Sequence, residues 1–592
     1  MGQRFDTMPR KNQLFLWVCI SIATATTVYL LTKSNNGGML PELCRSAYEQ
    51  QHGNPPGNHG SIIVAGQLIS DRDILSYEPW PEKQSRENFP GMLPPVVHYV
   101  WCGDKKFRFH DYLSVLSAVK LIEPLKLIFH YTHLPQTDSY NTWFQELKAS
   151  IAGLELRQLS PAPACGSKDL LQAVMGALST DGGVLIGSNV LLARFPNQFT
   201  GQTSSLFAFA PNSADKTQGI AFTKSGFDEA TKNSYLETIE KIAPSKNQND
   251  NNCVTVEAYN ARPDDAVCVI FNDVIINPRD IIEAQTPFAE LARWLFYGSR
   301  APALPKQDFE NPIPRISHFI RLKGSKKPED RGMYNEEFSF NHMVNILSAL
   351  YVAGFERVFL HLEGEEPRGR WWEEVKKERN VTVMKAVRPS SVFQTKVDVV
   401  QHVSDVLRYL TVYKYGGAYQ DFDVTWATRL SDSLLAYPAV AGMEWEQKDK
   451  EWPESFNLGV ILARPRAKWL RHYIETHKDF RDNDWGFNSL RMSYKTYELY
   501  PHQLLLDRKL QVICCSGTCH PAWEKPDYRR SGINDKRPTM SFSWQEVRAV
   551  HVTCPKPHPS LASPNAVKNG KDMFAEIGRN VLIKSGRQHL IS

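Results

Sequence analysis

Apolar positions along the chain group into short runs and helix-spaced stripes, and the same series of segments occurs twice. Each series starts with an apolar segment entered by proline, which is typical of a first buried strand in a parallel sheet. A predicted helix, a second strand and a polar, Trp-bearing helix follow in both. Strands that alternate with helices predict an α/β sheet with helices on its faces. The matching segments are 93–101 and 313–321, 107–119 and 338–350, 127–131 and 358–362, 182–190 and 416–424, and 266–269 and 549–552.

The repeat and the length together predict two domains. A chain of 592 residues is too long to fold around one core. We expect two tandem copies of one α/β, Rossmann-like domain, at residues 93–290 and 312–565, joined by a proline-containing segment near residues 302–314. Residues 566–592 are expected to form a C-terminal tail.

A membrane anchor is predicted near the N-terminus. Residues 14–32 carry no charge and are long enough to cross a bilayer as a helix. Arg4, Arg10 and Lys11 precede this stretch and only Lys33 follows it closely, an asymmetry that holds the N-terminus in the cytosol. A cleaved signal peptide is the main alternative, but its apolar core normally ends in small residues, whereas this one ends in further apolar residues. A buried soluble helix is a third interpretation, for which the segment lacks an amphipathic pattern.

This anchor predicts a single-pass type II membrane protein with residues 1–13 as its cytosolic tail. Residues 33–92 are rich in Gly, Pro and Asn, which is typical of a stem between a membrane and a folded region. The remainder is expected in the lumen. Asn380 begins the only N-x-S/T sequon, and a lumenal topology would expose it to glycosylation.

Charge and cysteine content narrow the classes of function. The formal charge of +5 is small for this length, and no basic block interleaved with aromatics favours a nucleic-acid partner. Ten cysteines permit disulfides in an oxidising compartment. Cys514, Cys515, Cys519 and His520 resemble zinc ligands superficially, but their spacing is not that of a usual zinc knuckle, so we favour disulfide or packing roles.

Candidate chemistry is concentrated at residues 416–424, which read Gly-Gly-Ala-Tyr-Gln-Asp-Phe-Asp-Val. Side chains two positions apart in an extended segment point the same way, so Asp421 and Asp423 are expected to converge on one hard cation. Gly416 and Gly417 permit close backbone approach or positive φ between a helix and a strand, and a simple helix cap is an alternative that does not exclude this role.

The helix before the glycine pair adds two charged candidates. Asp398, Gln401, Asp405 and Arg408 have the spacing of one helical face. A solvated face with a weak surface ion pair is the alternative to a binding role.

The string from Ser404 to Asp423 resembles the DxD-containing glycosyltransferases of family 32, the α-1,4-galactosyltransferase-like and yeast α-1,6-mannosyltransferase-like group. Their pattern reads S-D-x-x-R, a short apolar helix and G-G-x-Y-x-D-x-D, and each fixed position is present here. The resemblance implies a GT-A-like second domain, Mn2+ or Mg2+, a UDP-sugar donor and retention of anomeric configuration. It also implies that Asp405 and Arg408 contact the donor and that Asp421 and Asp423 are the catalytic metal ligands.

Three further residues are assigned from the resemblance with alternatives left open. His551 looks like a late-strand histidine that binds metal or diphosphate, and a satisfied core histidine is the alternative. Asn457 resembles the family's asparagine after the acceptor loop, and a turn role is the alternative. Tyr419 is placed in the donor site, where packing is expected more than reaction. Residues 444–452 combine aromatics and carboxylates, as a sugar-acceptor surface or a charged loop.

The first copy is expected to be catalytically silent. Gly187 and Asn189 stand where the second copy has its two aspartates, and the positions of Asp405 and Arg408 fall on Leu171 and Val174. The alignment places Cys268 at the position of His551. No charged pair is left there to hold a divalent cation.

The complete interpretation is a Golgi-type membrane glycosyltransferase that moves a hexose or N-acetylhexosamine from a nucleotide sugar to a glycan or glycolipid acceptor. Two alternatives remain. Asp421 to Thr425 fits the D-x-D-x-T signature of aspartate-nucleophile phosphatases. Alternatively, both copies are inactive and the protein is a lumenal lectin or accessory subunit. The sequence assigns no catalytic base or nucleophile, donor sugar, acceptor linkage, disulfide connectivity or oligomeric state.

Overall fold

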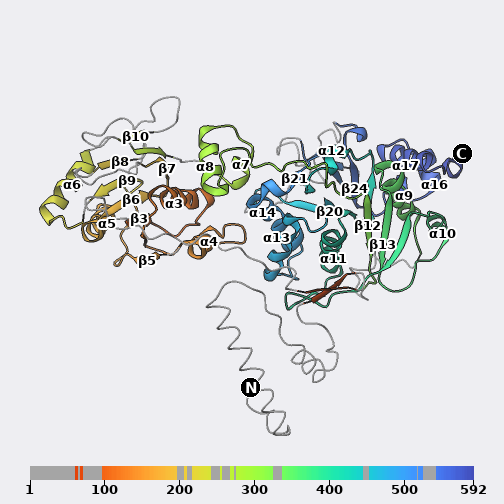
Figure 1. Ribbon diagram of the computed structural model, residues 1–592, viewed down its shortest axis with the longest axis horizontal. Coiled ribbons are helices and arrows are strands. Elements are labelled where there is room, and N and C mark those ends of the chain that lie inside the picture. The colour runs from red at the N-terminus through yellow and green to blue at the C-terminus, as the bar shows by residue number, and fades with distance from the viewer. Residues whose placement is uncertain are drawn as a thin grey trace, which may run out of the picture. The chain divides into compact units, whose positions relative to one another are not determined.

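The computed structural model contains two regions of mixed α/β structure (Figure 1). Residues 62–592 pack as one compact unit. The predicted cytosolic tail and anchor, and the stem apart from strands β1 (Ser61–Val64) and β2 (Gln67–Ser70), lie outside the described residues. Among the described helices, none combines the length and apolar character needed to span a membrane. The structure describes residues 61–64, 67–70, 96–151, 153–195, 206–209, 217–223, 225–241, 254–256, 267–271, 275–324, 337–444, 452–515, 518–523 and 542–592.

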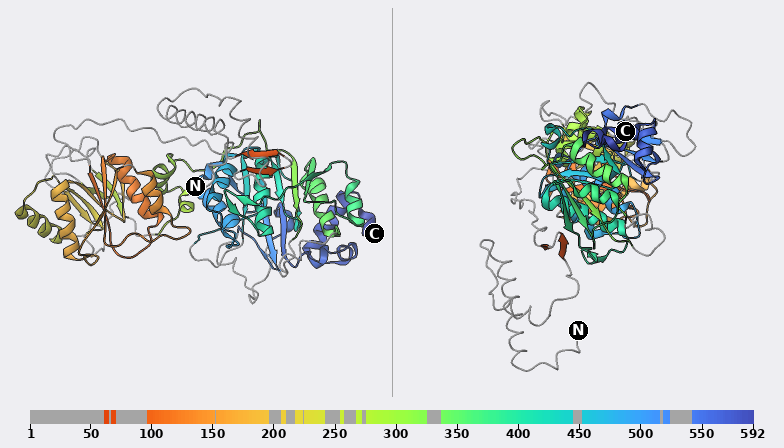
Figure 2. Two further views of the ribbon diagram at one scale, coloured as in Figure 1. Left: turned by 90° about the horizontal axis from the view of Figure 1, so that it is seen from below. Right: turned by 90° about the vertical axis from the view of Figure 1, so that its right-hand side faces the viewer.

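The first region is built on a six-stranded sheet with the order β5-β4-β3-β6-β9-β8. Strands β3 to β6 are parallel, and β9 and β8 extend the sheet in antiparallel pairings. Figure 2 shows this sheet, coloured orange to yellow, between helices on both faces. The strands are β3 (Val96–Trp101), β4 (Lys126–Tyr131), β5 (Leu154–Gln158), β6 (Gly183–Gly187), β8 (Leu206–Phe209) and β9 (Gly219–Thr223), with a separate three-stranded sheet of β10 (Val254–Val256), β11 (Val267–Phe271) and β7 (Val190–Arg194). The helices are α3 (Phe109–Ile122), α4 (Trp143–Ser150), α5 (Lys168–Asp181), α6 (Glu229–Lys241), α7 (Pro278–Ile282) and α8 (Pro287–Tyr297).

The second region has a seven-stranded sheet with the order β14-β13-β12-β17-β20-β19-β21. Its strands are β12 (Ile316–Arg321), β13 (Arg357–Leu362), β14 (Val381–Lys385), β17 (Gly417–Gln420), β19 (Ala439–Met443), β20 (Phe456–Ala463) and β21 (Leu505–Leu506). A four-stranded sheet joins β18 (Val424–Trp426), β24 (Ala549–Cys554), β22 (Gln511–Cys515) and β23 (Thr518–His520), and a small hairpin joins β15 (Ser391–Val392) and β16 (Thr395–Lys396).

Helices cover both faces of the second sheet. Helices α9 and α17 lie on one side of β12 and β13, and α11 and α13 lie on the other (Figure 1). The helices are α9 (Phe340–Ser348), α10 (Arg370–Lys376), α11 (Val400–Tyr415), α12 (Asp432–Leu435), α13 (Lys468–Thr476), α14 (Met492–Leu499), α16 (Pro564–Asn569) and α17 (Met573–Lys584). Shorter turns of helix lie at Ala349–Ala353, His477–Asp479, Phe487–Arg491, Pro501–Gln503, Trp544–Glu546, Pro559–Leu561 and Gln588–Leu590.

The predicted first and second strands and first helix are confirmed in both regions, because buried parallel strands read as continuous apolar runs. The two sheets also share a buried histidine pair. His98 Nδ1 lies 2.9 Å from His130 Nε2, and the matching distance between His318 and His361 is 3.1 Å. In each region the first histidine also contacts the carbonyl of the glycine that ends the helix before the central strand.

The prediction that residues 566–592 form a C-terminal tail outside the second domain is wrong. Residues 564–584 form α16 and α17, and Phe574, Ile577, Val581 and Leu582 are buried in the same core as α9 and β12. The apolar spacing of these residues covers one face of the sheet, so the second region extends past residue 565.

The expected disulfide role of the cysteine cluster is confirmed. Cys514 pairs with Cys519, and Cys515 pairs with Cys554 on the neighbouring strand. A third disulfide joins Cys102 and Cys165 in the first region. The thiols that a structural zinc site would need are therefore consumed.

Candidate active site

The two aspartates of the motif lie in a turn, not in the extended segment that the sequence predicted. Strand β17 ends at Gln420, and Val424 begins β18 after donating its N–H to the carbonyl of Asp421 at 3.1 Å. The turn brings the side chains of Asp421 and Asp423 together by reversing the chain. Their backbones are tied to neighbouring strands, since Asp421 N–H donates to Gly459 and the Asp423 carbonyl accepts from Val552.

His551 joins the aspartates through strand pairing. Strand β24 runs antiparallel to β18 with His551 opposite Val424, which places the imidazole beside the turn. Its Nε2 lies 3.2 Å from Asp423 Oδ1. Ligand atoms of Asp421, Asp423 and His551 lie within 4.8 Å of one another, and no other such group of three occurs in the described part of the chain. Two carboxylates and one imidazole form a donor set that fits Mn2+ or Mg2+ with waters completing the shell.

Sequence reasoning missed Lys556. Its Nζ lies 2.5 Å from Asp423 Oδ2, on the segment that leaves β24 after His551. The disulfide between Cys515 and Cys554 fastens this segment to β22. In the sequence, Lys556 is visible only as a lysine five positions after the candidate metal histidine. Its place beside Asp423 follows only once the pairing of β24 with β18 is known.

The charges at this group stabilise one another. Burial raises the pKa of the Asp423 carboxyl, but His551 and Lys556 outweigh burial and hold that pKa well below its usual value. Burial lowers the pKa of His551, and the neighbouring carboxylate of Asp423 more than offsets this and raises it. The same balance raises the pKa of Lys556, with Asp421 contributing as well. The Asp423 carboxylate is therefore ionised and available to a cation at neutral pH.

Arg408 and Asp405 form a buried pair, so the alternative of a solvated helix face is wrong. Both side chains are only 10% exposed, and Arg408 Nη2 lies 2.9 Å from Asp405 Oδ1 and 3.2 Å from Asp421 Oδ1. Arg408 Nη1 donates to the carbonyl of Leu458 at 2.9 Å. Its buried Nε has no hydrogen-bond partner among the described residues, which leaves one donor for a ligand. Asp398, expected on the same helical face, precedes α11 and pairs with Lys396.

Tyr419 packs and also orients a carboxylate. Its ring lies 4.7 Å below the Arg408 guanidinium, and its hydroxyl donates to Asp421 Oδ1 at 2.6 Å. Burial raises the pKa of Tyr419 well above its usual value, so the hydroxyl stays a donor. Asp421 is thus held between a neutral and a charged donor.

The glycine pair has the predicted conformational role. Gly416 ends α11 with φ 68°, and Gly417 begins β17 with φ 93°. A Cβ at Gly417 would lie 2.3 Å from the carbonyl oxygen of Ile316 on β12. Only glycine fits this close approach of β17 to β12. The approach fixes the position of β17, and therefore of the aspartate turn that follows it.

Asn457 is engaged within the protein. Its amide donates to Glu444 Oε2 at 2.8 Å, and its side-chain oxygen accepts from Gly459 N–H at 2.7 Å. A donor-binding role for Asn457 stays a prediction. Most of the predicted acceptor loop, residues 445–451, lies outside the described residues.

Residues 354–441, which include Arg408, the glycine pair and both aspartates, match the family model of the glycosyltransferase sugar-binding region containing the DXD motif. This stretch of the chain is therefore similar to the sugar-binding region of DXD glycosyltransferases. Glucan organizing enzyme 1 of Cryptococcus neoformans var. grubii is 23% identical over 273 residues, which cover 45% of this chain and 70% of that enzyme.

Two solved structures are also similar to this chain. The galactosyltransferase LgtC, solved with donor and acceptor sugar analogs, is 13% identical, and the match covers 46% of this chain and 95% of LgtC with a TM-score of 0.27. The bifunctional glycosyltransferase WbbM is 9% identical over 64% of this chain and 68% of its own, with a TM-score of 0.29.

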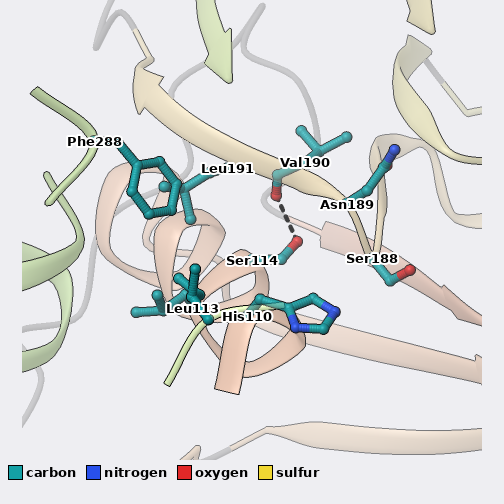
Figure 3. Close-up of a pocket in the computed structure, with 9 residues that line it drawn as sticks. His110, Leu113, Ser114, Ser188, Asn189, Val190, Leu191 and Phe288 are labelled. Atoms are coloured by element: carbon teal, nitrogen blue, oxygen red, sulfur yellow. Dashed lines mark hydrogen bonds between the residues drawn. The ribbon is translucent and has the colours of Figure 1, made fainter. Parts of the chain in front are cut away.

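The first region has a different arrangement at the place that matches the aspartate turn. Figure 3 shows Ser188 and Asn189 after β6 and, beside them, Ser114, which donates to the carbonyl of Val190 at 2.5 Å. His110 and Phe288 also line the remaining cavity, which has a volume of about 10 Å3. That is room for about one water.

The register of β11 corrects one expected correspondence. Val190, which matches Val424, pairs with Phe271, so a phenylalanine takes the position of His551. Cys268 instead pairs with Arg194, at the other end of β7, and an ungapped sequence match does not detect this register. Cys268 is disulfide-bonded and does not occupy the position of His551.

Proposed function

We propose that this glycosyltransferase moves a hexose or N-acetylhexosamine from a UDP-sugar to a glycan or glycolipid acceptor with Mn2+ or Mg2+ bound at Asp421, Asp423 and His551. The observation that carries the proposal is the convergence of these three ligands beside two cations, the buried Arg408 and the exposed Lys556. Such a constellation suits a diphosphate, which carries charge that both a metal and fixed cations can balance.

The charged residues have separate tasks in this proposal. When bound, the cation supplies positive charge that offsets the charge developing on the leaving nucleoside diphosphate. Lys556 leaves its contact with Asp423 and donates to a phosphate oxygen. Arg408 uses its free Nε donor on a donor oxygen, while Asp405 holds the guanidinium plane and Tyr419 holds Asp421. Gly459 leaves room for the His551 ring, because a Cβ there would lie 2.5 Å from it.

We further propose that both regions are GT-A-like domains and that only the second performs chemistry. The shared strand order and the shared histidine pair support a duplicated fold. Gly187, Asn189 and Phe271 replace the metal ligands in the first region. A Cβ at Gly187 would lie 2.6 Å from the carbonyl oxygen of Thr217, so no aspartate fits there without a backbone shift.

The proposed location is the Golgi membrane, with residues 14–32 as a type II anchor and the catalytic region in the lumen. The three disulfides among the described residues suit an oxidising compartment. Asn380 is exposed, as a glycosylated sequon in the lumen requires. Retention of anomeric configuration is proposed from the family resemblance.

A donor screen tests the proposal. The full-length protein in detergent is incubated with UDP- and GDP-sugars, with Mn2+ or with a chelator, and nucleoside diphosphate release is measured. Glucans are included among the acceptors because the Cryptococcus relative carries that word in its name. We expect metal-dependent release from a UDP-sugar that the Asp423→Asn variant lacks. Metal-independent hydrolysis of an aryl phosphate, with no diphosphate release, would instead support the phosphatase alternative.

A further inference from the structure

A second hollow lies away from the metal ligands. It has a volume of about 650 Å3, within the roughly 300–1,000 Å3 typical of ligand sites. Helix α7 of the first region forms one wall, and the segment after β21 forms another. Trp523 and Tyr497 contribute aromatic surface, and the other polar lining comes from charged side chains.

Two ion pairs to one buried carboxylate fix the floor of this hollow. The Glu454 carboxylate is 8% exposed and lies between two guanidinium groups, 3.3 Å from Arg279 and 3.2 Å from Arg508. Arg508 also donates to the carbonyl of Ala522 at 3.1 Å. Both arginine side chains are about one-third exposed, so their remaining N–H donors face the hollow from fixed positions.

This hollow and the group of Asp421, Asp423 and His551 lie at the same edge of the seven-stranded sheet. Strand β20 is antiparallel to both β17 and β19, and β21 is parallel to β19, so β17 and β21 run in the same direction. Asp421 follows β17 and Asp507 follows β21, three strands away. At about 4.8 Å per strand the separation is about 14 Å. A ligand that occupies both places must be an extended chain.

The charge balance of the hollow excludes strongly charged ligands. Arg279, Arg508 and Lys509 face four carboxylates, which leaves a formal charge of −1. A second nucleotide would meet no net positive field, and an apolar ligand would leave these charges without partners. A neutral chain of hydroxyl groups can use donors, acceptors and the aromatic faces together.

We propose that the hollow between α7 and the segment after β21 binds a distal part of an oligosaccharide acceptor, so that the first region contributes to acceptor recognition. The proposal rests on the proposed function, because the reducing or non-reducing end of that chain must reach the metal group. Arg508 and Glu283 are the specificity residues on the two walls.

Binding without donor tests the site independently of transfer. The full-length protein is titrated with a ladder of neutral gluco- and manno-oligosaccharides, from the single sugar to the hexasaccharide, and tryptophan fluorescence is recorded. We expect binding only for the longer members. The Arg508→Lys variant keeps the charge but loses the planar fork, so its Kd should rise about tenfold for long ligands.

A second pocket variant and a control variant separate loss of ligand contacts from loss of structure. Arg508 also holds Glu454, so a loss of binding there could reflect a loosened floor. Glu283 is exposed at the end of α7, so Glu283→Gln leaves the fold intact and should weaken binding several-fold. Glu290→Gln, exposed on α8, is the matched control and should change nothing. Unchanged binding in both pocket variants, or binding of hexalysine in place of the sugars, would overturn the proposal.

Failure of the two proposals can be told apart. Metal-dependent hydrolysis of the sugar nucleotide without acceptor reports the metal site alone. If hydrolysis occurs but affinity does not depend on chain length, the distal site is wrong and the transferase function stands. If no sugar nucleotide is turned over while the pocket variants lose oligosaccharide binding, the hollow is a glycan site on a protein with another activity.

Discussion

Residues 96–297 and residues 313–592 share a strand order and buried polar contacts, yet they differ at one edge of the sheet. In the first region that edge carries Gly187, Asn189 and Phe271, and in the second it carries Asp421, Asp423 and His551. The contacts that hold the central strand in place are nevertheless retained in both. The comparison shows that the contacts that build the sheet can be kept while the polar residues at its edge change.

The first region also has a direct role in holding the second. The Tyr140 hydroxyl donates to Glu498 Oε2 at 2.8 Å, and the Lys495 ammonium donates to the carbonyl of Tyr140 at 2.6 Å. Trp452 donates its indole N–H to Ser139 at 3.1 Å. The first region, which lacks the counterparts of Asp421, Asp423 and His551, therefore still contributes hydrogen bonds that hold it against the second.

The largest expected effect is at the metal ligands. Asp423→Asn removes one charged ligand and should lower diphosphate release about a thousandfold, since electrostatic groups at a transition state contribute roughly this much. Isothermal titration with Mn2+ should show loss of metal binding as well. Asn189→Ala at the matching position of the first region is the control and should retain full turnover. Near-normal release by Asp423→Asn would remove the distinction between the regions.

The contact between the regions should respond to pH. Burial raises the pKa of Glu498 from 4.5 to about 7, against hydrogen bonds from Tyr140 and Tyr494 and the charge of Lys495. The folded state keeps this proton up to about pH 7, whereas the unfolded chain releases it above about 4.5, so stability falls as pH rises through this window. The loss is about 3 kcal/mol at most. Denaturant titrations should show that Glu498→Gln removes this slope, and a persisting slope would contradict the assignment.

Arg408 distinguishes the helices before the two glycine pairs, because Val174 takes its place in the first region. Arg408→Lys keeps the charge but loses the fork that reaches Asp405, Asp421 and Leu458 together. We expect about a hundredfold lower kcat/KM for the donor. Val174→Leu, a conservative change at the counterpart, should leave kcat/KM unchanged. Equal losses in both variants would point to a general effect on stability.

Most of the strands and helices of the two sheets could be predicted from the sequence. Buried parallel strands appear as continuous apolar runs, and a glycine pair marks a close approach of two backbones. The candidate ligands Asp421 and Asp423 were predicted from their spacing after the glycine pair, whereas His551 was predicted from the family resemblance. Lys556 was missed because a lysine after a strand has no pattern of its own and its role depends on strand register. The ungapped match of Cys268 to His551 was wrong for the same reason, since pairing between distant strands is not encoded locally.

The smallest expected effect tests whether the two frameworks are equivalent. Ser117 Oγ accepts from Leu192 N–H at 3.0 Å, and Ser348 Oγ accepts from Trp426 N–H at 3.0 Å, each tying the first helix to the strand after the motif. Replacing either serine by alanine leaves a buried N–H without a partner and should cost about 1–3 kcal/mol of unfolding free energy.

Thermal unfolding with mass spectrometry of proteolytic fragments assigns the loss to one region or the other. Ser117→Ala should lower the unfolding midpoint of the first region, and Ser348→Ala that of the second, by similar amounts. Only Ser348→Ala should also lower turnover, because Trp426 ends the strand that begins directly after the aspartate turn. If Ser117→Ala reduced turnover equally without loss of stability, the first region would have to take part in the chemistry, and the separation of framework from catalysis would be wrong.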